Sequence, residues 1–236
     1  MSRLPVVAVE RVAMRFAPRP WPFAVERRAE IDACFAQLQR AQPALWNGRV
    51  LMMYEHTLTA NELRGSFLET DFASLLAWRA FDFPGRAIKV CFPMSALYCS
   101  DGAFLLGLMA PHTANAGQLY FPTGTPDPDD VRGDTVDFDG SLLRELAEET
   151  GLTADDVAVA PGWHAVLAGP RLALIKLLQV AEPAAALRAR ILAFLDRERE
   201  PELCDIVIVR SRADLDAQMP EFVTAFLIDF WNRHAS

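Results

Sequence analysis

Hydrophobic and polar residues alternate along several short segments, a pattern typical of strands with one buried face. On this basis we predict strands over residues 6–16, 49–59, 87–98, 103–109, 118–122, 156–166, 171–180 and 204–210. The turn-forming residues Ser100-Asp101-Gly102 separate the third and fourth of these strands. Those two strands are therefore predicted to form a hairpin.

In other segments, apolar spacing and capping residues indicate helices that pack by one face. The predicted helices cover residues 24–41, 71–81, 141–150 and 183–199, and one or two more end the chain over 212–233. Asp71 is a candidate cap for the start of the second helix, and Gly151 is expected to end the third. Because strands and helices interleave without a repeating period, the sequence predicts a mixed α/β fold.

Composition narrows the class of protein. The 236 residues are 52% hydrophobic and 23% charged, which is a globular balance. The net charge of −8 disfavours a nucleic-acid partner, because proteins that neutralise phosphates usually carry a basic face. The four cysteines form no CxxC pair and are predicted to be reduced thiols. No apolar run approaches the roughly 18 residues of a membrane span, so a soluble, cytoplasmic protein without membrane contact is predicted.

The segment that follows residue 143 concentrates carboxylates at helical spacing. Glu145, Glu148 and Glu149 stand at i, i+3 and i+4, so a helix brings all three to one face. Like charges at this spacing repel by about a few tenths of a kcal/mol per pair. A hard divalent cation reverses the sign, because it binds several oxygen ligands. The alternative interpretation is a solvated acidic surface without a ligand.

With its continuation, this segment resembles the second half of the Nudix box, G-x5-E-x7-R-E-U-x-E-E-x-G-U, where U is a bulky aliphatic residue. Every specified position from Arg144 to Leu152 matches. The first half departs from the pattern. Gly124 is the best candidate for the leading glycine, but its loop is six residues too long, and the isolated glutamate of the pattern falls on Val136. The nearest carboxylates that could replace that glutamate are Asp137 and its rivals Asp134 and Asp139.

The resemblance implies a Nudix-type α/β/α sandwich around a mixed sheet over residues 86–236, with the catalytic helix near 141–150. Residues 1–85 would form an N-terminal extension of strand, helix, strand and helix that packs on this core. Such extensions often serve dimerisation in Nudix hydrolases, so the resemblance also implies a homodimer.

The resemblance further implies residue roles. Glu148 and Glu149 would be the primary ligands of Mg²⁺ or Mn²⁺, and Glu145 would be a ligand or would position the attacking water. Arg144 would orient the carboxylates, and Gly124 would supply a backbone ligand or a tight turn.

The remaining candidates lie outside the box. A general base often comes from a separate loop in this family, and Glu202 is favoured over Glu198 and Glu200, with a solvated helix end as the alternative. The cationic residues that precede or begin the central strands could bind phosphates, or could be ordinary surface charge. They are Arg64, Arg86 and Lys89.

The implied activity is metal-dependent hydrolysis of a diphosphate linkage in a small nucleoside diphosphate derivative. Pro43–Met52, Leu63-Arg64-Gly65 and Pro126-Asp127-Pro128 resemble the branch that hydrolyses UDP-glucose and UDP-galactose. The altered first half of the box leaves a catalytically inactive nucleotide-binding module of Nudix fold as an alternative. The amphipathic segments 183–199 and 215–233 leave a helical assembly protein as another.

Overall fold

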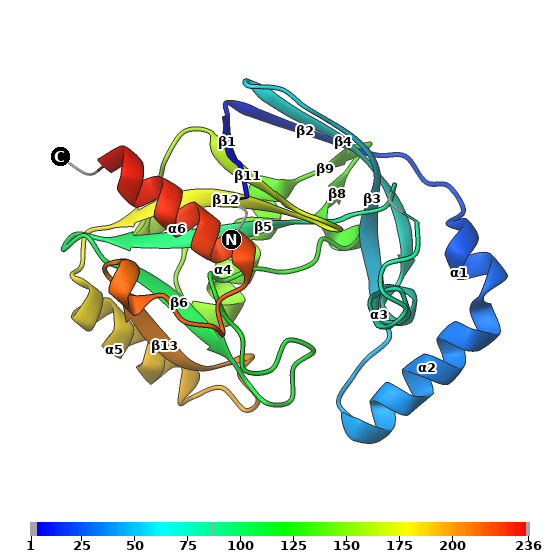
Figure 1. The fold of residues 1–236 in the computed structure, drawn as a ribbon. Helices are drawn as coiled ribbons and strands as arrows, with labels where there is room; N and C mark the ends of the chain where they lie inside the picture. Colours follow the sequence, from blue (N-terminus) through cyan, green and yellow to red (C-terminus); the bar gives the residue numbers. More distant parts are fainter. Residues whose placement is uncertain (1–3, 86, 235–236) are drawn as a thin grey trace.

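The computed structural model describes residues 4–85 and 87–234, and its strands form two sheets (Figure 1). The first sheet has the order β1-β11-β12-β5-β6-β13, with β10 beside β12 and β7 beside β6. Strands β5 and β12 are parallel, whereas the other pairs are antiparallel, so this sheet is mixed. Its strands are β1 (Val6–Val9), β5 (Val90–Cys99), β6 (Phe104–Met109), β7 (Leu119–Tyr120), β10 (Ala158–Val159), β11 (Trp163–Ala168), β12 (Arg171–Val180) and β13 (Leu203–Val209).

The second sheet has the order β3-β4-β2-β9-β8. Its strands are β2 (Arg11–Phe16), β3 (Arg49–Leu58), β4 (Glu62–Asp71), β8 (Val131–Arg132) and β9 (Thr135–Val136). Lys89, just before β5, exchanges backbone hydrogen bonds with Met53 of β3, at 2.8 and 3.0 Å. This bridge joins the edge of the second sheet to the first.

Helices cover both faces of the first sheet. Helix α6 packs against β11 and β1, whereas α4 packs against β5 and α5 against β13 (Figure 1). Helices α1 to α3 lie beside the second sheet instead. The helices are α1 (Pro22–Glu26), α2 (Arg28–Ala41), α3 (Phe72–Ala80), α4 (Phe138–Thr150), α5 (Ala184–Leu195) and α6 (Glu221–His234), and the short 3-10 helices are η1 (Pro128–Asp130), η2 (Ala154–Asp156) and η3 (Arg212–Asp214). The predicted α/β fold with a mixed sheet between helical layers is confirmed.

Several predicted boundaries are wrong, and each has a local cause. The single strand expected over 6–16 divides at a bend at Glu10 into β1 and β2, which enter different sheets. The helix expected over 24–41 divides near Arg27 into α1 and α2. The strand expected over 156–166 begins only at Trp163, because the 3-10 helix η2 extends to Asp156 and the short β10 follows it.

Strand β4 was not predicted, because charged residues and Gly65 interrupt its hydrophobic pattern. Gly65 pairs with Met14 and His56 on the neighbouring strands. A Cβ atom there would stand 2.8 and 2.7 Å from the sulfur atoms of Met14 and Met53. The glycine therefore serves close packing of methionine side chains on the strand surface.

In both sheets, strands of the N-terminal segment pair with strands of the remaining chain. Strand β1 joins the sheet that carries α4, while β8 and β9, which directly precede α4, join the sheet of β2 to β4. The division at residue 85 stays a prediction.

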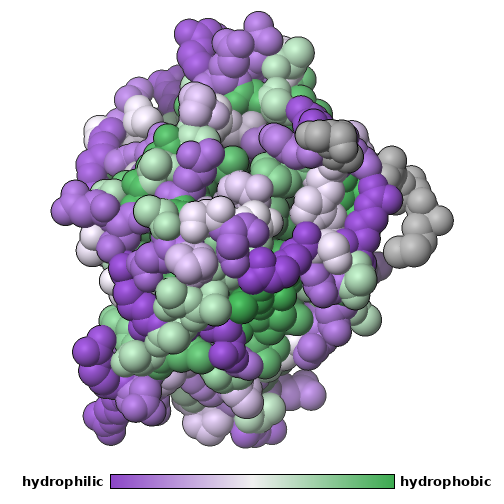
Figure 2. Space-filling view, turned by 90° about the vertical axis from the view of Figure 1, so that its left-hand side faces the viewer, coloured by the Kyte–Doolittle hydropathy of each residue, from purple (hydrophilic) through white to green (hydrophobic). Residues whose placement is uncertain are grey.

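One hydrophobic core extends through both sheets, and a smaller cluster lies between α2 and α3. On the face that carries α5 and α6, hydrophilic residues surround a smaller hydrophobic area (Figure 2). Within residues 4–85 and 87–234, no helix is both long and apolar enough to cross a bilayer.

Candidate active site

Helix α4 is fixed at both ends and along one face. The Asp137 side chain accepts a hydrogen bond from the Gly140 amide at 2.9 Å, which caps the helix start. Gly151 ends it in the left-handed conformation, with φ of 71°. Leu142 and Leu146 are buried in the core. The acidic residues of the helix therefore project from its other sides at defined positions.

Glu149 is the most deeply buried carboxylate of this helix. Only 3% of the residue is exposed, and its Oε2 accepts a hydrogen bond from the Thr123 amide at 3.1 Å. The second oxygen, Oε1, is buried without a hydrogen-bond partner. Burial, followed by the charges of Glu202 and Glu145, raises the pKa of Glu149 well above its usual range. An oxygen of this kind is costly to bury unless a cation or a proton compensates it.

Glu145 lies against Gly124. A Cβ atom on Gly124 would stand 2.1 Å from the Glu145 carboxyl carbon, so no larger residue fits there without displacing that carboxylate. Glu145 Oε1 also stands 2.8 Å from Arg144 Nη1. Burial is the main cause that raises the pKa of Glu145, to about 7. The structure thus brings the predicted glycine to the predicted carboxylate across the lengthened loop.

Glu202 approaches this cluster from the residue before β13. Its carbonyl oxygen accepts a hydrogen bond from the Ala110 amide at 2.8 Å, which fixes the backbone beside the end of β6. Burial and then the charge of Glu148 raise the pKa of Glu202, while His112 opposes the shift. The charge of Glu202 in turn raises the pKa of both Glu145 and Glu149. Glu202 therefore belongs to the same electrostatic cluster.

Glu148 is placed differently from its two neighbours. Its side chain is 59% exposed, and one oxygen stands 3.3 Å from Arg144 Nη1. Among the residues that the structure describes, no three His, Cys, Asp or Glu side chains already stand together as a metal site. Mutual repulsion of the carboxylates and their pairing with Arg144 favour this spread arrangement.

Arg144 is held by a carboxylate that the sequence did not reveal. Its Nη2 donates to Asp130 Oδ1 at 3.1 Å. Asp130 is 3% exposed and also accepts hydrogen bonds from the Ser141 hydroxyl at 2.9 Å and the Asp127 amide at 3.1 Å. Burial alone would lower the pKa of Arg144, but the charge of Glu145 and the hydrogen bond to Asp130 raise it above its usual value. The guanidinium is therefore anchored between the loop and the helix.

The three aspartates expected to replace the missing glutamate of the box have other partners. Asp137 caps α4, Asp139 stands 3.3 Å from Lys176, and Asp134 stands 3.8 Å from Arg15. Val136, the position of that glutamate in the pattern, is buried in the core. A sequence signal for the buried Asp130 was available. Asp-Pro-Asp-Asp is typical of the start of a 3-10 or α-helix, and Asp127 and Asp130 form the capping pair of η1.

We expect Asp130→Asn to release Arg144 and to destabilise the fold by about 2 kcal/mol, because a charged partner is lost at a buried position. Urea unfolding measures the change. Asp134→Asn is the matched control, because Asp134 is exposed, and its effect should stay within about 0.5 kcal/mol. Equal effects of the two substitutions would remove the anchoring role of Asp130.

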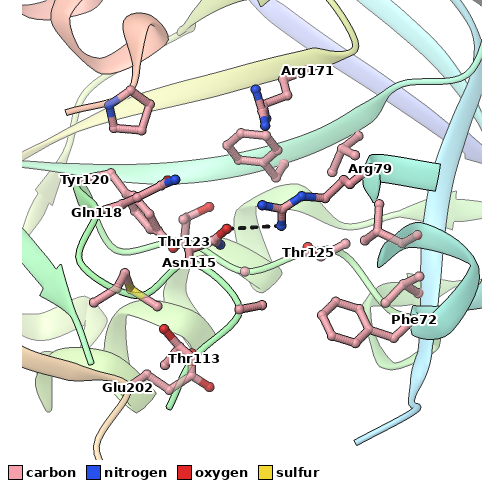
Figure 3. Close-up of a pocket in the computed structure, with 18 of the residues that line it drawn as sticks. Phe72, Arg79, Thr113, Asn115, Gln118, Tyr120, Thr123, Thr125, Arg171 and Glu202 are labelled. Atoms are coloured by element: carbon pink, nitrogen blue, oxygen red, sulfur yellow. Dashed lines mark hydrogen bonds between the residues drawn. The ribbon is translucent and has the colours of Figure 1, made fainter. Parts of the chain in front are cut away.

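A cavity of about 900 Å³ opens beside the cluster, between the first sheet and the N-terminal elements. Glu145 and Glu202 line one part of it, together with Gly124 and Thr123. The cationic residues of its wall are Arg49, Arg79 and Arg171. Figure 3 shows Arg79 and Arg171. The aromatic side chains include Trp46, Phe72, Phe83, Phe92, Tyr120 and Phe222.

A scan against protein-family models and a search of curated proteins find no match. Among solved structures, the chain is similar to a Nudix hydrolase from M. smegmatis, RenU, with a TM-score of 0.40 and 18% identity over 61% of this chain and 84% of that one. It is similar to a MutT protein from Methanosarcina mazei Go1, with a TM-score of 0.42 and 17% identity over 63% and 96%. For an Ap4A hydrolase from C. elegans the TM-score is 0.44, with 17% identity over 61% and 98%.

Two of the three cationic residues predicted from the sequence, Arg64 and Lys89, do not line the cavity. Arg64 is exposed and pairs with Glu62 at 2.6 Å, while Lys89 Nζ donates to the Gly169 carbonyl at 2.9 Å. The third, Arg86, lies outside the described residues. Arg64 pairs with a residue two positions earlier on its own strand, whereas the partner of Lys89 lies 80 positions away, which local sequence does not reveal.

The donor set fits a hard divalent cation. Carboxylate oxygens of Glu145, Glu148 and Glu149, with the backbone of Gly124, are the oxygen ligands that Mg²⁺ or Mn²⁺ prefers. Because Glu149 Oε1 is buried without a hydrogen-bond partner, a bound cation would stabilise it. Outward Glu148 would have to turn inward to contribute. The arrangement can therefore bind a cation next to a cavity large enough for a nucleotide-sized molecule.

Proposed function

We propose that the protein is a Nudix hydrolase that cleaves a diphosphate linkage in a nucleoside diphosphate derivative, with Mg²⁺ or Mn²⁺ as cofactor. The single observation that carries this proposal is the buried, unpartnered oxygen of Glu149 beside the charges of Glu145 and Glu202. A bound divalent ion would neutralise the diphosphate and lower the pKa of its water.

In this proposal Glu149, Glu148 and Glu145 hold the ion with the backbone of Gly124, and Arg144 positions the carboxylates. Arg144 can do so because it reaches Glu145 and Glu148 while Asp130 anchors it. Glu202 is the general base. Its raised pKa supports this role, because a base works best when its pKa approaches the working pH.

Hydrolysis of a panel of nucleotide diphosphates with Mg²⁺ and with Mn²⁺, with products identified by mass, tests the proposal. The panel contains nucleotide sugars, ADP-ribose, dinucleoside polyphosphates and CoA. Metal-dependent cleavage between two phosphates supports the enzyme. Tight nucleotide binding without turnover would instead favour the inactive binding module. Preference for UDP-glucose or UDP-galactose, a cytoplasmic location and a homodimer stay predictions.

We further propose that Trp46 stacks on an aromatic part of the substrate. Trp46 is 79% exposed, lines the cavity, and packs its ring so close to Gly48 that a Cβ there would stand 2.3 Å from it. A large aromatic ring in water beside a cavity suits a ligand that covers it.

For Trp46→Ala we expect the KM of the substrate found in the panel to rise about tenfold, because stacking on a base is worth about 1–3 kcal/mol. The free energy of unfolding should change by less than about 0.5 kcal/mol, since the residue is exposed. Val25→Ala, at another exposed apolar residue away from the cavity, is the control and should leave KM unchanged. An unchanged KM in Trp46→Ala would exclude stacking.

A further inference from the structure

Two arginines converge on the cavity from distant parts of the chain. Arg79 comes from the last turn of α3, and Arg171 is the first residue of β12. Both are partly buried and both line the cavity. Their guanidinium groups approach the same region, and Glu202 lies at the other side of the view (Figure 3).

The charges of this pair are not balanced by carboxylates. Within the described part of the chain, neither arginine forms a salt bridge, in contrast to most other arginines. Arg79 Nη1 donates to Asn115 Oδ1 at 3.1 Å, and the Arg171 guanidinium lies 5.4 Å from the centre of the Phe83 ring. Burial and the charge of Arg171 lower the pKa of Arg79. Two partly buried cations held together in this way repel each other until an anion binds between them.

Neutral residues separate the arginines from the acidic cluster. The Asn115 amide that accepts from Arg79 also donates, through Nδ2, to the Tyr120 hydroxyl oxygen at 3.0 Å. Burial, Glu149 and Glu202 raise the pKa of Tyr120, whereas Arg79 lowers it. Tyr120 therefore lies within the field of both charge clusters. The cavity has an acidic end and a basic end with Tyr120 and Asn115 between them.

We propose that Arg79 and Arg171 form an anion-binding subsite, and that the substrate carries a phosphate or carboxylate group in addition to its diphosphate linkage. Guanidinium groups bind these planar or tetrahedral oxyanions through paired hydrogen bonds. The second clause rests on the proposed function, because it takes the acidic end as the place of the diphosphate. Such a ligand would be anionic at both ends, with the divalent ion offsetting the charge of the diphosphate and the two arginines offsetting that of the additional group.

Calorimetric titration of the protein with inorganic phosphate and, separately, malonate tests the subsite. Divalent ions are first removed with EDTA, and the EDTA, itself a polycarboxylate, is then removed by dialysis, so binding through a divalent ion is excluded. The wild-type protein should bind at least one of the two anions, and Arg79→Gln and Arg171→Gln should each weaken it by about tenfold or more, because a charge-assisted bond is lost. Tighter binding of phosphate indicates a phosphate ester, and tighter binding of malonate a carboxylate. If neither anion binds the wild-type protein, the subsite is refuted.

Two further variants make the result specific. Arg11→Gln removes an exposed arginine outside the cavity and should leave anion binding unchanged. Glu149→Gln should also leave anion binding unchanged. The test of the subsite is therefore independent of the test of the proposed hydrolase activity. Arg79→Gln also removes the hydrogen bond to Asn115 and could weaken anion binding by loosening that loop. Arg171→Gln removes no such bond, so wild-type anion affinity in the Arg171→Gln variant would overturn the proposal.

The same anion should raise the Tm of the wild-type protein, because it binds only the folded state. In Arg79→Gln and Arg171→Gln the rise should disappear even if the starting Tm is unchanged. A purely structural role of the arginines would alter the starting Tm and leave the anion-dependent rise intact.

Discussion

Glu149→Gln is expected to lower kcat by about a thousandfold or more, which corresponds to several kcal/mol of lost charge stabilisation. The substitution keeps the size of the side chain and leaves an oxygen to accept from the Thr123 amide, but it removes the charge of the unpaired Oε1. Because that charge is costly without a cation, the metal-free variant should be at least as stable as the metal-free wild-type protein. Loss of activity without loss of stability is the signature of a ligand, and a destabilised variant would point to a structural role.

The pH dependence of stability gives this prediction a second measurement. Folding raises the pKa of Glu145 from 4.5 to about 7 and that of Glu149 well above 4.5, so the folded protein binds more protons than the unfolded chain above pH 4.5. The metal-free wild-type protein should therefore lose stability as pH rises from about 4.5 through 7, with no such loss below that window. Mg²⁺ should counteract the loss, and Glu149→Gln should flatten the dependence. Denaturant unfolding at a series of pH values measures each curve.

Glu202→Gln is expected to lower kcat by about a hundredfold or more with little change in KM, because it removes a base that acts only in the chemical step. Its residual activity should rise steadily with pH, since hydroxide can replace the missing base. Glu198→Gln is the matched control: Glu198 is exposed, lies four positions earlier and does not line the cavity. Steady-state rates over a pH series separate the two variants. Comparable rates for Glu202→Gln and the wild-type protein would assign the base to another residue.

The segment of α4 was predictable because its chemistry is local. Carboxylates at i, i+3 and i+4 and a glycine at the end lie within one short run of sequence. The start was predicted at Ser141, but the helix begins at Phe138, because Asp137 caps it instead of replacing the missing glutamate. The link between Gly124 and Glu145 was also accessible, through the resemblance of the segment to a known pattern. Local spacing thus predicts the helix and the carboxylates that share one of its faces.

The residues that depend on tertiary structure were not predictable in this way. Asp130 reaches Arg144 only after η1, β8 and β9 fold back onto α4. Arg79 and Arg171 are far apart in the sequence and meet because α3 and the start of β12 border the same cavity. Likewise, nothing near Glu10 shows that β1 and β2 enter different sheets, because both sides of the bend alternate alike.

A crystal structure of the protein with Mn²⁺ would show whether Glu149 holds a metal ion, because the ion can be located by its anomalous scattering. We expect an anomalous peak in contact with Glu149 Oε1 at about 2.1 Å, a distance typical of small hard cations bound by oxygen. Glu148 should turn toward the same peak, and Glu145 should lie beside it. If Glu149 Oε1 remains buried without a ligand at saturating Mn²⁺, with no peak near Gly124, then helix α4 does not carry a metal site.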